Sequence, residues 1–535
     1  MARSETSLKG RYRHLLAAFP PCFHGRGRFL GGGILPAPAR TDSDYTTGQD
    51  RQELAESDGI AARAETCFPL PPRRGSEMTR RKLLASAAAA AGSRLLGAPA
   101  GAPNIIFILC DDLGYGDLGV YGSKIRTPNF DRLASEGVRF TNFCSADPVC
   151  SPSRAALLTG RYPTRVGVPR VLFPQDTDGL GLDETTLADV LKRRGYSTMC
   201  IGKWHLGRPR RYLPTSRGFD EYFGIPYSND MTPRVLMHNT DVIEQTADLS
   251  TLTARYTDQA RKFISRSKGS PFFLYMPHTF PHIPLAASER FRGKSAEGLY
   301  GDVVEEIDWS LGEVIAALKQ SGLEEDTLVM CSSDNGPWYQ GSPGKLRGRK
   351  NTTYEGGVRE PFIARWKGRI PAGRVSDGLA SMMDVFPTVA RLCGAALPSK
   401  PLDGIDIWPL IHGERQSIER APLLYFDNWD LQCARWMNWK LHIARHNTAA
   451  YTPAPPGGRF SFLLPKPELY NLASDPDESY DVAPENAQIV AQIESRIAKM
   501  IEDFPEPVRK AYAEQQARKA DPNTPTGAYP KPAGR

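Results

Sequence analysis

One short segment of the chain combines a thiol, the predicted start of a helix and an arginine one turn into that helix. Residues 148–160 read Pro-Val-Cys-Ser-Pro-Ser-Arg-Ala-Ala-Leu-Leu-Thr-Gly. Ser151 is a typical N-cap residue and Pro152 a typical first helical residue, which predicts that a helix begins there. Cys150 then lies at the positive end of the helix dipole, where a low thiol pKa would suit a nucleophile. Arg154, one turn into the helix, can face an anion held at the same end.

Polar side chains follow four short apolar runs that have the composition of strands covered on both faces. The runs are 104–110, 196–201, 271–276 and 327–332, and helical patterns lie between them at 186–194 and 303–320. The polar residues that follow the runs are Asp111 and Asp112, Lys203 and His205, His278 and His282, and Asp334 and Asn335. Alternating strands and helices predict an α/β fold with a mostly parallel sheet. All four groups should then emerge at one sheet edge, where such folds bind ligands.

Part of this polar set offers only oxygen ligands, namely Asp111, Asp112, Asp334 and Asn335. Hard cations prefer such ligands, which favours Ca²⁺ over Zn²⁺, with Mg²⁺ as the second choice. A lone Asp-Asp pair after a strand is more often a loop cap. The Asp-Asn pair at another strand end makes a shared metal site the better interpretation.

Several segments, taken together and in order, resemble the signatures of the type I sulfatases. The segments are Asp111-Asp112, 150–160, 195–205, 282–284, 334–337 and 350–357, and the resemblance covers about residues 103 to 480. Residues 219–230 further resemble the arylsulfatase A and galactosamine-6-sulfatase branch. The resemblance implies an alkaline-phosphatase-like α/β/α sandwich with a mostly parallel central sheet and a smaller C-terminal antiparallel α+β subdomain.

The resemblance also implies a modified nucleophile. In the family, the motif cysteine, here Cys150, is oxidised to formylglycine by a formylglycine-generating enzyme, and the aldehyde hydrates. One hydroxyl attacks the sulfur of a sulfate ester, and the other then expels sulfate, so that release is intramolecular. The ion, expected to be Ca²⁺, is held by the four oxygen-bearing residues together with residue 150.

The remaining roles follow from the same resemblance. Arg154 and Lys203 should hold and polarise the hydrated aldehyde. His205 should remove the proton of the second hydroxyl as sulfate leaves. His282 and Lys350 should grip the sulfate and stabilise or protonate the leaving oxygen.

Two further residues are candidates for substrate binding. His278 is the alternative to His282, which is preferred because the family's histidine is followed by one residue and then proline. Ser228 stands where the branch has a serine in the pocket. Asn229 stands where some members carry histidine, so the resemblance does not name the sulfate ester, and aryl and carbohydrate sulfates both stay open.

The rest of the chain sets the domain organisation. Residues 1–77 have no sustained periodicity and are expected to be a disordered leader or a mis-assigned start. Residues 78–102 carry Arg80-Arg81, a short Ala-rich stretch and small residues, which predicts a twin-arginine signal and a periplasmic or secreted enzyme without a stable membrane anchor. The expected parts that follow are a catalytic domain (103–415), an α+β subdomain (416–515) and a disordered tail (516–535). Within the subdomain, residues 485–515 are expected to form an amphipathic helix.

Composition excludes few function classes. A net charge of +7 on 535 residues, with no long block of like charge, gives no sign of nucleic-acid binding. The nine cysteines have no zinc spacing. Cys110, Cys200 and Cys331 lie in or at the ends of apolar runs and are expected to be buried thiols, so a disulfide framework is not expected. Two alternatives to a sulfatase remain: a phosphatase or phosphodiesterase of the same superfold, and a binding protein that kept the fold without catalysis.

Overall fold

The computed structural model describes residues 101–446 and 461–520 of the chain. The expected leader, nearly all of the expected signal segment and the last residues of the expected tail lie outside these ranges. Within them, none of the helices combines the length and the apolar character needed to cross a bilayer.

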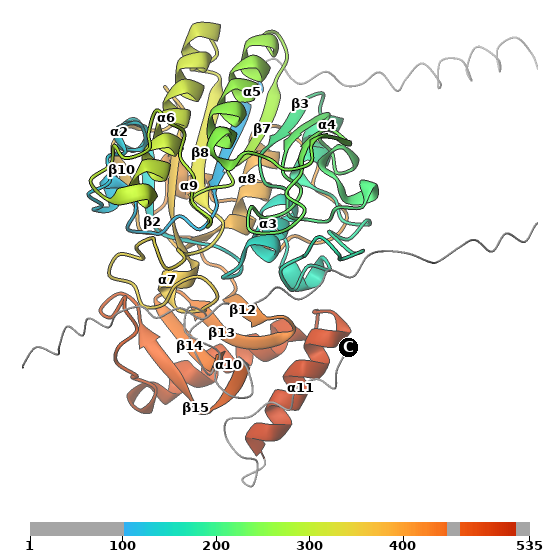
Figure 1. The fold of residues 1–535 in the computed structure, drawn as a ribbon. Helices are drawn as coiled ribbons and strands as arrows, with labels where there is room; N and C mark the ends of the chain where they lie inside the picture. The colour runs from blue at the N-terminus through green and yellow to red at the C-terminus, as the bar shows by residue number, and fades with distance from the viewer. Residues whose placement is uncertain (1–100, 447–460, 521–535) are drawn as a thin grey trace, which may run out of the picture. The chain divides into compact units, whose positions relative to one another are not determined.

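A large central sheet organises most of the described chain before residue 415 (Figure 1). Its strands, in the order of the sheet, are β10 (Arg374–Ser376), β2 (Val138–Cys144), β9 (Arg359–Arg365), β8 (Thr327–Ser333), β1 (Asn104–Cys110), β7 (Phe272–Pro277), β3 (Ser197–Ile201), β4 (Glu221–Gly224), β5 (Leu236–His238) and β6 (Asp241–Glu244). The short β11 (Ala380–Ser381) pairs with β2. The central strands β8, β1, β7, β3 and β4 are parallel, whereas β9, β5 and β6 pair antiparallel with their neighbours. The four strands predicted from apolar runs are the buried centre of this sheet.

Each face of the sheet packs into its own apolar core, because successive strand side chains point to opposite faces. In β1, Ile105, Phe107 and Leu109 belong to one core and Ile106 and Ile108 to the other. The helices of the domain are α2 (Pro128–Ser135), α3 (Cys150–Thr159), α4 (Leu187–Arg193), α5 (Leu252–Arg266), α6 (Gly298–Ser321), α7 (Glu355–Val358), α8 (Val385–Leu392) and α9 (Trp408–His412). Residues of α2, α5 and α6 fill the second core, and residues of α3, α4 and α8 fill the first. The domain is therefore a three-layered α/β/α arrangement.

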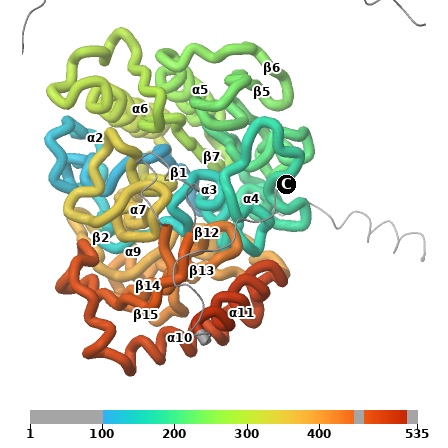
Figure 2. The backbone as a smooth tube through the Cα atoms, turned by 60° about the horizontal axis from the view of Figure 1, so that its bottom comes forward, coloured from blue at the N-terminus to red at the C-terminus, as the bar shows by residue number. Residues whose placement is uncertain are grey.

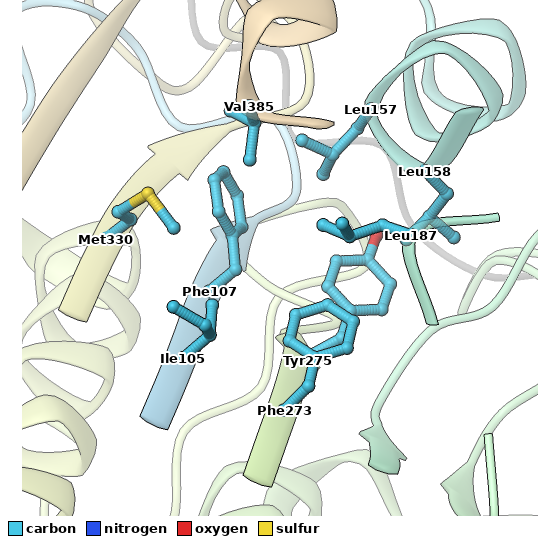
Figure 3. Close-up of a pocket in the computed structure, with 9 residues that line it drawn as sticks. All are labelled: Ile105, Phe107, Leu157, Leu158, Leu187, Phe273, Tyr275, Met330 and Val385. Carbon is cyan, nitrogen blue, oxygen red and sulfur yellow. The ribbon is translucent and has the colours of Figure 1, made fainter. Parts of the chain in front are cut away.

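Helix α3 is fixed to the sheet by its apolar side (Figure 3). Leu157 and Leu158 line a small cavity of about 10 Å³ together with Phe107 of β1 and Val385 of α8. The cavity has room for about one water molecule, so the helix is closely packed. This packing holds the N-terminal end of α3, with Cys150, at the carboxyl edge of the sheet.

A second, antiparallel sheet forms the C-terminal part. Its strands are β12 (Leu423–Asp427), β13 (Asp430–Trp436), β14 (Trp439–His446) and β15 (Ser461–Asn471), in that order. Two helices, α10 (Ala487–Ile501) and α11 (Glu506–Ala520), both contact β13 (Figure 2). The sheet and helices form the predicted α+β subdomain.

Three local predictions differ from the structure. Helix α3 begins at Cys150, with Val149 rather than Ser151 at the N-cap position. The single helix expected at 485–515 is two helices, because Pro505 lacks the backbone N–H needed to continue the first one. The second helix continues to Ala520, past residue 516, where the tail was expected to begin. The seven cysteines in the described part of the chain are all buried and free, including Cys110, Cys200 and Cys331, which were expected to be buried.

Candidate active site

The polar residues predicted to converge do meet at the carboxyl ends of the parallel strands. Backbone hydrogen bonds tie these ends together, from Lys203 N to Pro277 O at 2.8 Å and from Asp334 N to Cys110 O at 3.1 Å. Gly202, just before Lys203, has a φ of 130°, and a Cβ there would lie 1.8 Å from Pro277 O. Only glycine permits this close approach, which places Lys203 over the sheet edge.

Three buried ion pairs organise the site. Lys203 Nζ lies 2.6 Å from Asp111 Oδ2. Arg154 Nη2 lies 2.7 Å from Asp334 Oδ2, and it also lies 3.5 Å from Asp111 Oδ1. The third pair joins Lys350 Nζ to Asp112 Oδ1 at 2.8 Å. Three carboxylates therefore face three cations, so an added divalent cation would make the site positive and attractive to a sulfate group.

The protonation states in this cluster are set by competition between burial and neighbouring charge. Burial alone would raise the pKa of Asp111, but Lys203 and Arg154 hold it below its usual value. Burial and then Asp111 raise the pKa of Asp334 to about 7. Burial alone would lower the pKa of Lys350, but Asp112 raises it above its usual value, so this lysine is cationic.

Cys150 lies in this cluster as a neutral thiol. Burial raises its pKa to about 12, although Lys203 and Lys350 act in the opposite direction. The low thiol pKa expected from the helix start alone is therefore wrong, because desolvation outweighs the helix dipole and the two lysines. The unmodified thiol is a poor nucleophile at neutral pH.

The site has the ligands that a metal ion needs. One ligand atom each from Asp111, Asp112, Cys150 and His282 lies within 4.8 Å of all the others. Asp111 Oδ1 and Asn335 Oδ1 are buried without a hydrogen-bond partner in the described part of the chain. Unpaired buried oxygens are costly, and a cation would satisfy both. The residues present therefore fit a bound metal, and oxygen predominates among their donor atoms.

Asp334 and Asn335, predicted as ligands, join the cluster through hydrogen bonds to Asp112. Asp112 N donates to Asp334 Oδ1 at 3.2 Å, and Asn335 Nδ2 donates to Asp112 Oδ1 at 2.7 Å. Asp112 has a φ of 67°, in the left-handed region that residues other than glycine rarely adopt. Such strained backbone gathers at functional sites, where the surrounding structure imposes it.

His282, rather than His278, faces the carboxylates. His282 Nδ1 lies 2.5 Å from the carbonyl oxygen of Ile283, which can only accept a hydrogen bond. The Nδ1 proton is thus fixed, which leaves Nε2 as an acceptor 3.7 Å from Asp112 Oδ2. Asn229 Nδ2 steadies this loop by donating to the carbonyl oxygens of His282 and Pro284 at 3.1 and 3.2 Å.

His278 is buried outside this network. Burial lowers the pKa of its imidazole to about 4, and neither ring nitrogen has a hydrogen-bond partner among the described residues. Its backbone N–H bonds to Leu109 O at 2.7 Å, which joins two strand ends. Ser228 is in the site, because its hydroxyl accepts a hydrogen bond from Lys203 Nζ at 3.1 Å.

His205 is arranged as a neutral base. Its Nε2 lies 2.8 Å from Leu172 O and must donate to that carbonyl, so Nδ1 carries no proton. Nδ1 is buried without a partner in the described ranges. Burial, and then the nearby Lys203 and Arg154, lower the pKa of this imidazole well below its usual value. This nitrogen is therefore free of a proton and able to accept one.

The C-terminal subdomain holds the segment that carries Lys350. Glu355, five residues further along the chain, accepts hydrogen bonds from Lys440 Nζ and Arg435 Nη1, both at 2.9 Å. Glu478 accepts from Glu355 N at 2.6 Å. The residue pattern around Lys350 did not reveal this role of Glu355, because the partners lie some 80 residues away in the sequence.

Two family models cover most of the chain. The model described as "Sulfatase" matches residues 103–395, and the one described as "C-terminal region of aryl-sulfatase" matches residues 418–528. This chain belongs to the sulfatase family. The sulfatase is 40% identical to arylsulfatase A of Bos taurus over 447 residues, covering 74% of this chain and 88% of the relative. It is 41% identical to N-acetylgalactosamine-6-sulfatase of Canis lupus familiaris over 388 residues, covering 66% and 74%.

Other relatives and solved structures agree with this placement. Steryl-sulfatase of Mus musculus is 37% identical over 503 residues, covering 72% of this chain and 80% of that one. A sulfatase structure from Pseudoalteromonas sp. is 30% identical with a TM-score of 0.67, covering 84% of this chain and 97% of that one. A phosphonate monoester hydrolase of Agrobacterium radiobacter, 21% identical with a TM-score of 0.54, shares the fold alone.

These matches establish the coarse function. The sulfatase is a sulfuric ester hydrolase with the alkaline-phosphatase-like fold and its smaller antiparallel C-terminal sheet. The predicted family, fold and reaction are confirmed. The matched relatives named as sulfatases favour neither the phosphatase alternative nor the non-catalytic one.

Proposed function

We propose that the sulfatase uses a formylglycine made from Cys150 and a Ca²⁺ ion bound beside it. The observation that carries this proposal is the location of Cys150, a neutral thiol inside a cluster of carboxylates and cations. Oxidised to an aldehyde by a formylglycine-generating enzyme and then hydrated, residue 150 supplies one hydroxyl that attacks sulfur and another that expels sulfate.

The oxygen-rich ligand set supports Ca²⁺ over Mg²⁺, because a larger ion tolerates an irregular arrangement of ligands. Asp111, Asp112, Asp334 and Asn335 would hold the ion with the oxygen of residue 150, whose place the Cys150 sulfur marks. The bound ion would polarise the sulfate oxygens. His282 also has a ligand atom in this cluster, and its Nε2 would contact the ion when unprotonated or the sulfate when protonated.

The chain's own residues divide the proton transfers. Arg154 and Lys203, both buried and paired with carboxylates, would orient the hydroxyls of residue 150. His205 Nδ1 would accept the proton of the second hydroxyl as sulfate leaves. Lys350, and His282 once its Nε2 carries a proton, would stabilise the oxygen of the departing alcohol. Ser228 would keep Lys203 in position.

Export by a twin-arginine signal is part of the same proposal. Arg80 and Arg81 precede an Ala-rich stretch in the sequence, and translation from Met78 would place this pair near an N-terminus. Periplasmic or extracellular sulfate esters would then be the substrates.

Mass spectrometry of the purified enzyme tests the modification. The peptide that contains Cys150 should be about 18 Da lighter than the thiol form, since one sulfur and two hydrogens leave and one oxygen enters, outside the usual oxidation ladder. The same preparation should release sulfate from 4-nitrophenyl sulfate much faster than phosphate from 4-nitrophenyl phosphate. Full activity with an unmodified thiol would refute the proposal.

A further inference from the structure

The proposed proton acceptor, His205, is held at its backbone and at the tip of its ring. Its backbone N–H donates to Pro226 O at 3.1 Å, and its φ of 62° is in the left-handed region. At the ring, Nε2 donates to Leu172 O at 2.8 Å. This bond keeps Nδ1 free of a proton and sets the direction in which Nδ1 points. A movement of the Leu172 carbonyl group would therefore move the proposed base.

The segment that supplies this carbonyl is anchored to the residue next to the nucleophile position. Ser151, in the first turn of α3, is fully buried, and its hydroxyl accepts a hydrogen bond from Leu172 N at 3.1 Å. The Leu172 side chain is itself buried in the apolar core that α3 helps to fill. The N–H and the C=O of Leu172 flank one Cα atom, so a fixed N–H restricts the position of the carbonyl group.

Asp176 fixes the same carbonyl group from the other side. Its Oδ2 accepts from Phe173 N at 2.7 Å, and its own N–H donates to Phe173 O at 3.0 Å, which closes a tight turn. Phe173 N and Leu172 O belong to one planar peptide group, so the carboxylate at the N–H sets the plane in which the carbonyl lies. Arg170 Nη1 in turn donates to Asp176 Oδ2 at 2.6 Å and keeps the carboxylate in place.

We infer that Ser151 and Asp176 are positioning residues for His205. Both act through the peptide group between Leu172 and Phe173, whose carbonyl accepts the bond from the imidazole. The inference rests on the proposed function, in which Nδ1 accepts the proton of the second hydroxyl as sulfate leaves, and it adds the groups that hold this base in place. Loss of the serine hydroxyl would leave a buried N–H without its acceptor, and loss of the carboxylate would let the peptide group rotate.

Step-resolved kinetics of the full-length enzyme with 4-nitrophenyl sulfate test this inference, with each rate divided by the formylglycine content found by mass spectrometry. Ser151→Ala and Asp176→Ala should each lower kcat roughly 10- to 100-fold, the range for a misplaced catalytic group. In contrast, kcat/KM reports the steps up to alcohol release and should change little, because the proposed base acts later, when sulfate leaves. Ser151→Thr keeps a hydroxyl and should restore most of the lost turnover.

A double replacement separates positioning from a general structural effect. When His205 has already been replaced by alanine, adding Asp176→Ala should lower kcat no further, because the base that it positions is gone. The matched control is Asp178→Ala, which removes the more exposed of the two carboxylates paired with Arg170. Its kcat should stay near the native value.

Native kcat in both Ser151→Ala and Asp176→Ala would overturn the inference alone. The same holds for an equal loss in Asp178→Ala, or for a further loss when His205 is already absent. If Ser151→Ala is not converted to formylglycine, Asp176→Ala decides the question, because it lies outside the segment around Cys150. A native enzyme without formylglycine, or one that hydrolyses no sulfate ester, would instead overturn the proposed function.

Discussion

Lys440, on strand β14 of the C-terminal sheet, donates a hydrogen bond at 2.9 Å to Glu355 of the catalytic domain, and both side chains are fully buried. This contact and the neighbouring one from Arg435 fix the segment that begins at Lys350. The C-terminal subdomain therefore helps to position a candidate catalytic residue that its own sequence does not contain.

Replacement of Lys440 tests this link. Lys440→Met keeps the length of the side chain but leaves Glu355 and Glu478 with one fewer buried cation, which should cost about 3 kcal/mol of unfolding free energy. Denaturant unfolding measures the loss. The exposed Lys367→Met is the control and should leave the unfolding midpoint unchanged, so equal midpoints for both variants would contradict the prediction.

Cys150→Ser should bind substrate and lose most of its turnover. A serine has a single hydroxyl, so after attack on sulfur it cannot expel sulfate from the same carbon. Rapid-quench kinetics should show one fast release of the alcohol per enzyme molecule. The steady-state rate that follows should be at least 100-fold below that of the native enzyme, since sulfate release is no longer intramolecular. Multiple turnovers at the native rate would argue against a hydrated formylglycine.

Asp111→Asn should weaken metal binding. The change removes a buried charge whose Oδ1 lacks a hydrogen-bond partner among the described residues. We expect Ca²⁺ affinity, measured by calorimetry on chelator-treated protein, to fall roughly 100-fold, with little loss of secondary structure. As a control, Asp258→Asn removes a half-exposed carboxylate of α5 and should bind Ca²⁺ normally. Stoichiometric zinc in the native enzyme would contradict the assignment of this site to Ca²⁺.

Asn229 should be needed for the orientation of His282. Asn229→Ala removes two hydrogen bonds to backbone carbonyls and should cost roughly 1–3 kcal/mol of stability. Asn229→Asp places a carboxylate against the same carbonyl oxygens, and it should lower kcat/KM by at least as much as Asn229→Ala does. As a control, Asn486→Ala loses a comparable bond to Val482 O at 2.8 Å but should keep full activity. Equal activity in all three variants would remove Asn229 from the site.

Export can be tested in cells. A chain that starts at Met78 should reach the periplasm, whereas replacing both Arg80 and Arg81 with lysine should retain it in the cytoplasm, because the receptor reads paired guanidinium groups and not charge alone. Cell fractionation and activity measurements distinguish the two. A mature N-terminus upstream of Met78, found by sequencing the native protein, would contradict this prediction.

Much of the site was predictable because its determinants are local in the sequence. Apolar runs that end in polar residues define buried strands and the groups at their carboxyl ends, so Asp111, Lys203 and Asp334 were placed at one edge by strand direction alone. The segment around Cys150 likewise predicts a helix that starts just after the nucleophile. Its boundary was off by two residues, because caps shift easily between neighbouring residues.

The tertiary structure decided what depends on burial and on distant partners. The thiol pKa of Cys150 is raised because the folded chain excludes water around it, an effect that a helix start does not encode. Only packing shows that His282 faces Asp112 while His278 joins two strand ends. Glu355 gained its role from Arg435 and Lys440, which belong to the second sheet. Spacing along the chain can determine which groups a strand presents, but the free energy of each group depends on neighbours that only the fold brings together.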